Sequence, residues 1–172
     1  MWTNSKKPST TSQRPAFVNT ADAFCAHIES AATFDRISFI PVCFVLISRL
    51  LSEVIELPEA TGQLDTHNIA DERYNEIIQL LKTNLQEGDY YTMMLDPYEV
   101  ASQPVVGSVV GDLADIWRGL KDGLEALAAG SLENAIAQWR FSFANQWGDQ
   151  ATQVLRPLIT VLLRNGWQEQ ES

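Results

Sequence analysis

The chain has 172 residues, of which 45% are hydrophobic, so it is long enough to bury the core of one domain of ordinary size. It carries 22 acidic and 12 basic residues, a formal net charge of −10. A chain with this balance repels phosphate backbones, which argues against nucleic-acid binding and favours, if anything, basic partners.

The first 18 residues differ in composition from the rest. They are rich in Ser, Thr, Lys and Pro and hold no acidic residue. Because such a segment has little apolar surface to bury, we expect residues 1–18 to form a disordered tail ahead of a single helical domain over residues 19–168. No apolar stretch follows the first lysines, so the tail does not resemble a secretory signal.

Cysteine usage and the most apolar run both favour a cytoplasmic protein. Cys25 and Cys43 lie in apolar helical stretches and are expected to be two buried thiols, with a redox pair as the alternative. The most apolar run, residues 37–47, is about eleven residues long, short of the roughly 20 that span a bilayer. A buried core helix explains this run better than a membrane span.

Apolar residues at three- and four-residue steps predict the helices in the first half of the chain. The first is expected over residues 21–33, with Thr20 as a plausible cap. The second is expected over residues 38–56, where Pro41 is tolerable only in the first turn. Because the second helix is apolar nearly all round, it should lie at the centre of the fold.

The same pattern continues in the second half. A third helix is expected over residues 66–86, followed by an irregular aromatic linker in which residues 90–95 are the best candidate for a strand. A fourth should run from residue 104 or 105 to residue 129. A fifth should begin at Ser131, its cap, and Pro157 should kink or break it. Five or six helices with short connections predict an all-α antiparallel bundle.

Templates for catalysis and metal binding mostly fail. The two histidines, His27 and His67, belong to no helical zinc or di-iron pattern, so structural or surface roles are expected for both. There is no Gly-rich loop that cradles phosphate and no nucleophile elbow. We therefore expect neither a metal nor a cofactor.

Two polar groupings in the fourth and fifth helices are candidates for a site. Asp112 and Asp115 lie on one face of the fourth helix with Arg118 at its edge, which suits a cation or a basic partner but is also an ordinary solvent face. Arg140 projects from an aromatic stripe of the fifth helix, so it must find an acid or a ring. We predict that it pairs with Asp115 or, less favourably placed, Asp112, with Asp122 and Asp96 as rival acids. The full candidate set is Asp112, Asp115, Arg118, Trp139, Arg140, Gln146, Trp147 and Gln150.

These segments resemble a bacterial family, the domain of unknown function numbered 5063. The family pattern has an F-D-P element, then S-L-x-D-D-L-A-D-I-Y-R-D-L-K, then W-R-F-x-F-x-x-H-W-G-x-H. The corresponding segments here are residues 95–97, 108–121 and 139–150. The resemblance implies a helical bacterial protein and no known activity. Gln146 and Gln150 stand where the family has histidines, so any acid–base or metal site there would have lost its usual ligands.

The function expected from the sequence is that of a non-enzymatic helical module that acts in the cytoplasm through contacts with another protein. The alternative is a small-molecule-binding or enzymatic pocket between the fourth and fifth helices, built from the eight candidate residues. No contact with nucleic acid or membrane is expected, and the oligomeric state stays open.

Overall fold

The protein is mostly helical, as the sequence predicts. The computed structural model describes residues 15–64, 69–85, 89–94, 98, 101 and 103–165. Within these ranges the strands form one small antiparallel pair. The elements in chain order are α1 Ala16–Glu29, the 3-10 turn η1 Ala31–Thr33, α2 Arg36–Val54, α3 Asp71–Leu85, β1 Tyr90–Met93, β2 Val105–Ser108, α4 Val109–Ala128, α5 Leu132–Ser142, the π-helical turn η2 Phe143–Trp147 and α6 Gly148–Asn165.

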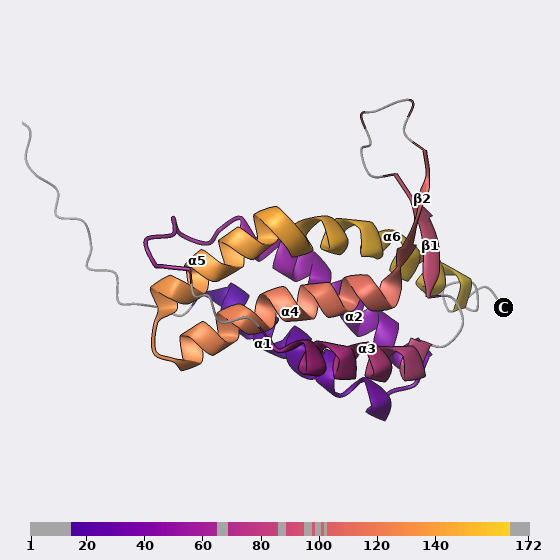
Figure 1. Ribbon diagram of the computed structural model, residues 1–172. Coiled ribbons are helices and arrows are strands. Elements are labelled where there is room, and N and C mark those ends of the chain that lie inside the picture. The colour runs from indigo at the N-terminus through magenta and orange to yellow at the C-terminus, as the bar shows by residue number, and fades with distance from the viewer. Residues whose placement is uncertain are drawn as a thin grey trace, which may run out of the picture.

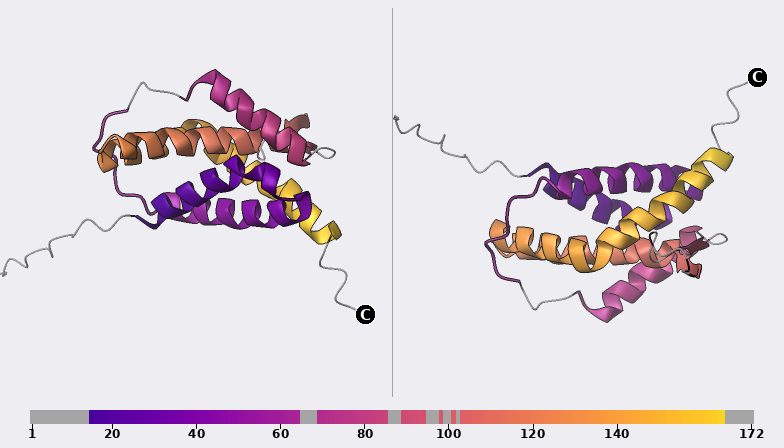
Figure 2. Two further views of the ribbon diagram at one scale, coloured as in Figure 1. Left: turned by 90° about the horizontal axis from the view of Figure 1, so that it is seen from below. Right: turned by 90° about the horizontal axis from the view of Figure 1, so that it is seen from above.

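α4 is the central helix. In the view from below it lies between α3 on one side and α1 and α2 on the other (Figure 2). α5 and α6 lie above it in the first view (Figure 1). Twelve of its 20 residues are buried, because it packs against neighbours on several sides. Gly119 and Gly123 lie on the side that faces α5, where the absence of a side chain lets large aromatic rings approach closely.

α2 is a peripheral helix, so its predicted central position is wrong. Six of its 19 residues are buried, and it packs on α1 and α6 with one face. On the outer face, Ile37 is 65% exposed and Val45 is 45% exposed. By length and composition α2 could cross a membrane, a test that core helices of soluble proteins also pass. The apolar composition of α2 therefore predicts more burial than the helix has.

The helical domain begins earlier than residue 19. α1 starts at Ala16, directly after Pro15, and the side chains of Phe17 and Val18 are fully buried in the core. Assignment of these residues to the tail is therefore wrong. Phe17 and Val18 alone are too few to display a helical period. The predicted start of the domain was therefore placed next to Thr20, the first recognisable cap. Residues 1–14 of the predicted tail lie outside the described residues.

Polar side chains fix where two helices begin. The carboxylate of Asp35 accepts the backbone N–H of Ser38 at 2.8 Å, so α2 begins at Arg36 rather than at Ser38. The hydroxyl of Ser131 accepts the backbone N–H of Asn134 at 3.1 Å, which confirms the predicted cap of α5.

Two prolines lie inside helices. Pro41 lies beyond the first turn of α2, because the cap at Asp35 starts that helix earlier than expected. Pro157 lies within α6, which continues past it to Asn165. Of the predicted kink or break at Pro157, the break is therefore wrong. The change between α5 and α6 comes before it, at the π-helical turn η2.

A β-hairpin stands at one end of the bundle and projects from it (Figure 1). β1 falls in the segment predicted as the best strand candidate, whereas β2 occupies residues that were expected to open the fourth helix. The carboxylate of Asp89 accepts the hydroxyl of Ser108 at 2.9 Å and the N–H of Val110 at 2.7 Å. The Ser108 hydroxyl in turn accepts the N–H of Gly111 at 3.0 Å. These bonds end the strand and start α4 at Val109.

Candidate functional site

The two aspartates predicted on α4 connect that helix to its neighbours. The Tyr91 hydroxyl on β1 donates to Asp112 at 2.6 Å, and the Tyr74 hydroxyl on α3 donates to Asp115 at 2.8 Å. Asp112 is only 8% exposed. Both carboxylates therefore serve contacts within the fold, the first to the hairpin and the second to α3.

Arg118 also faces α3. Its guanidinium lies 3.5 Å from the centroid of the Tyr74 ring and 3.8 Å from a carboxylate oxygen of Asp71. The interaction is mainly a cation–π contact, because the Asp71 side chain is almost fully exposed and its pairing is screened by water. Arg118 thereby completes a polar network with Tyr74 and Asp115 on this side of α4.

Burial perturbs the acidity of this network. Burial raises the pKa of Asp112 to about 6, the hydrogen bond from Tyr91 opposes the rise, and the charges of Asp115 and Asp89 add to it. Burial and the bond to Asp115 together raise the pKa of Tyr74 to about 12, so its hydroxyl stays a donor. The pKa of the Tyr91 hydroxyl is raised for the same reasons.

The two candidate tryptophans fill the other side of α4. Both indoles are fully buried; Trp139 donates to the carbonyl of Leu120 at 3.0 Å, and Trp147 donates to the Ser142 hydroxyl at 3.1 Å. A Cβ at Gly123 would overlap the Trp139 ring, as one at Gly119 would overlap that of Trp147. The contact between α4 and α5 is thus packed with aromatic rings.

The predicted pairing of Arg140 with Asp112 or Asp115 is wrong. Arg140 is exposed, and its Nη1 donates to the backbone carbonyl of Leu57 at 2.8 Å. Within the described part of the chain its guanidinium makes no ion pair. Trp139 takes the inward position on α5, which turns the next residue outward.

The eight candidates therefore do not meet in one cleft. Asp112, Asp115 and Arg118 lie toward the hairpin and α3, whereas the tryptophans lie toward α5 and η2. Gln146 is exposed, and Gln150 is half-buried with a buried amide oxygen that lacks a protein partner. His27 has a structural role, as predicted: it is buried and stacks on Phe39 with ring centroids 4.6 Å apart. His67 lies outside the described residues.

A different group of residues forms a hollow beside the hairpin. It has a volume of about 320 Å³ and lies where α2 begins, β1 runs and the second half of α6 passes. Three arginines line it, and in the described ranges none of them forms an ion pair. We call it the arginine hollow, and its lining is Arg36, Tyr90, Tyr91, Thr92, Arg156, Pro157, Thr160, Val161 and Arg164.

The charge of the arginine hollow is opposite to that of the whole chain. Its lining includes three of the chain's 12 basic residues and no carboxylate, although the net charge is −10. The Nε of Arg36 is buried and lacks a hydrogen-bond partner among the described groups. Buried donors are normally satisfied, so the site can accept an anionic oxygen.

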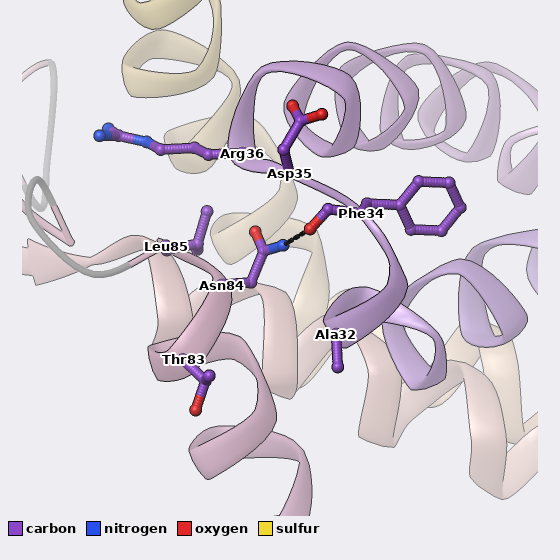
Figure 3. A pocket seen from close by; sticks show the side chains of 7 residues that line it. All are labelled: Ala32, Phe34, Asp35, Arg36, Thr83, Asn84 and Leu85. Carbon is purple, nitrogen blue, oxygen red and sulfur yellow. Dashed lines mark hydrogen bonds between the residues drawn. The ribbon is translucent and has the colours of Figure 1, made fainter.

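Arg36 also lines a second hollow, of about 450 Å³ (Figure 3). It lies between the start of α2 and the end of α3. The Asn84 amide nitrogen donates to the carbonyls of Ala31 and Phe34 at 2.9 and 2.7 Å, which fixes the orientation of the amide. Its buried oxygen is left without a donor. In Figure 3 the Arg36 side chain extends away from Asn84.

Part of the lining of the arginine hollow could be predicted from residue spacing in the sequence. Arg156, Thr160 and Arg164 recur every four residues and so lie on one helical face. The contributions of Arg36 and Tyr90 could not be read in this way, because they come from elements far apart in the chain. Among the described residues no group of three or more His, Cys, Asp or Glu could hold a metal ion.

The fold and site define a helical bundle with a basic hollow beside the hairpin. A family model for the domain of unknown function DUF5063 matches residues 9–164, so the chain belongs to that family. No curated protein matches the sequence.

A solved structure shares the fold. The crystal structure of protein BF1032 from Bacteroides fragilis, a structural-genomics target, matches with a TM-score of 0.70 and 25% sequence identity. The match covers 84% of this chain and 89% of that protein. Neither the description of the family nor that of the solved structure names an activity.

Proposed function

We propose that this protein is a non-enzymatic binding module that holds an anionic group of its ligand in the arginine hollow. The observation that carries the proposal is the presence of three arginines without ion pairs in one hollow of an acidic chain. Arginine presents a planar fork of donors that matches carboxylate and phosphate oxygens. The hydroxyls of Tyr90 and Thr92 add neutral donors.

The lining of the hollow supports binding over catalysis. Arginine, tyrosine and threonine supply hydrogen bonds and positive charge, while no carboxylate, imidazole or thiol lines the hollow to move a proton near neutral pH. The ligand that best fits an acidic chain with one basic hollow is another protein, because nucleic acid and anionic membrane would be repelled by the remaining surface. The free, buried thiols of Cys25 and Cys43 support a reducing compartment such as the cytoplasm.

Citrate is a suitable probe, because it carries three carboxylates and fits a hollow of this size. Calorimetric titration of the full chain at low salt should show saturable binding. The double variant Arg156→Gln/Arg164→Gln should bind citrate at least about tenfold more weakly, since charge-assisted hydrogen bonds contribute roughly 1.5–3 kcal/mol each. Arg49→Gln is the matched control, because Arg49 is an exposed arginine of α2 away from the hollow.

Citrate binding that the control variant retains and the double variant loses would support the proposal. Equal binding by the parent and the double variant would refute it, as would an absence of binding by the parent.

A further inference from the structure

The arginine hollow lies along the free edge of β1. Three consecutive strand residues, Tyr90, Tyr91 and Thr92, line it, and no residue of β2 does. Because side chains alternate between the two faces of a strand, a hollow that touches three residues in a row borders the edge rather than one face. β1 has β2 on one side, so the edge at the hollow is the unpaired one.

The alternation of bonded and non-bonded pairs between β1 and β2 shows which backbone groups point outward at this edge. The N–H of Val109 donates to the carbonyl of Asp89 at 2.7 Å, next to the pair Tyr90–Ser108. In an antiparallel ladder bonded and non-bonded pairs alternate, so Tyr91 bonds toward β2 and Tyr90 and Thr92 point outward. In the described part of the chain the backbones of Tyr90 and Thr92 have no partner outside the hairpin.

The arginines flank this edge. The hairpin stands across α6 rather than along it (Figure 1). Arg156 and Arg164 lie one helical turn on either side of Thr160, about 6 Å away along the axis in each direction. A strand added to β1 would therefore cross α6 between two guanidinium groups, within reach of one side chain that points toward the helix.

We propose that the outer edge of β1 binds an extended acidic segment of a partner protein as an added strand, with one anionic side chain held between Arg156 and Arg164. The proposal rests on the proposed function and names its ligand. Backbone pairing supplies the direction of the segment, and the arginines select the residue that faces α6. The positive hollow and an acidic side chain are complementary in charge, which favours this segment over neutral ones.

Short blocked peptides test the proposal on the full chain. The probe is acetyl-Thr-Val-Thr-Glu-Val-Thr-amide, compared with the same peptide carrying phosphoserine or glutamine in place of glutamate. We expect saturable binding of the glutamate or phosphoserine peptide and at least tenfold weaker binding of the glutamine peptide. Equal binding of all three would overturn the proposal.

Backbone pairing is tested with two N-methylated forms of the glutamate peptide, methylated at alternate residues in opposite phases. One form blocks the edge that faces β1, and the other blocks the edge that faces solvent. One form should lose binding at least tenfold while the other keeps it. If both bind like the unmethylated peptide, or both fail, the added strand is excluded.

A matched pair of variants locates the edge on the protein. Thr92→Pro removes an outward N–H from β1, whereas Val106→Pro removes the equivalent outward N–H from the far edge of β2, opposite Thr92 in the register. Peptide binding should be lost in the first variant and kept in the second; the reverse result would contradict the proposal.

Two outcomes separate this proposal from others. If citrate binds as expected and the acidic peptides do not, the added strand is wrong and the anion site stands. If the peptide binds only after Glu169→Gln and Glu171→Gln, the edge belongs to the chain's own last residues, which overturns the assignment to a partner.

Discussion

Trp139→Ala is expected to lower the free energy of unfolding by about 3–5 kcal/mol, the usual cost of removing a large buried aromatic side chain. The Trp139 indole is fully buried and packs edge-on against Phe17, with ring centroids 5.1 Å apart. Its removal also leaves the carbonyl of Leu120 without the indole donor. Gly123 lies directly against the ring and has no side chain with which to fill the space.

Urea denaturation monitored by circular dichroism would measure this loss. Phe141→Ala is the control on the same helix, since Phe141 is 47% exposed and its truncation removes far less buried surface. Similar losses for the two variants would show that the contact between α4 and α5 does not depend on Trp139.

Asp112→Asn is expected to stabilise the protein at pH 7.5 by about 1–3 kcal/mol, from the 1.36 kcal/mol that each unit of pKa shift represents. The carboxyl has a pKa of about 6 in the folded chain against an ordinary value of 3.8, because it is buried. Its protonated form therefore stabilises the fold below pH 4, and this stabilisation is lost as the pH rises through 6. Asparagine keeps an oxygen that can accept the Tyr91 hydroxyl without the buried charge.

The difference between parent and variant should be large at pH 7.5 and shrink as the pH falls toward 4. Unfolding free energies at both pH values for the parent, for Asp112→Asn and for Asp149→Asn would measure it. Asp149 is exposed, so its substitution removes a charge from the surface without changing burial. A difference for Asp112→Asn that is constant with pH, or that grows toward acid, would contradict the raised pKa.

The architecture of the bundle could be predicted because it depends on local signals. Helical periodicity predicted five or six helices in the observed order. Ser131 could be recognised from the sequence as the cap of the fifth helix, and its hydroxyl does accept the N–H of Asn134. The rotation of each helix about its axis could not be predicted in the same way. Counting from the turn at Gly130 leaves Arg140 about 7 Å from the height of Asp115, within reach of a long side chain. Trp139 takes the interior position, however, and Arg140 faces out.

The candidate site failed for a related reason. Asp112 and Asp115 are satisfied by Tyr91 and Tyr74, which come from an irregular linker and from another helix. Such long-range hydrogen bonds leave no trace in local spacing. The arginine hollow had only a partial signal, because Arg36 reaches it from the start of α2.

The most direct test of the arginine hollow is an NMR titration that follows the Nε–Hε resonances of the arginines as citrate is added. The resonances of Arg36, Arg156 and Arg164 should shift together with one saturation curve, while those of Arg49 and Arg73 stay in place. Shifts spread evenly over all arginines, or shifts that spare the three in the hollow, would contradict the assignment of this hollow as the binding site.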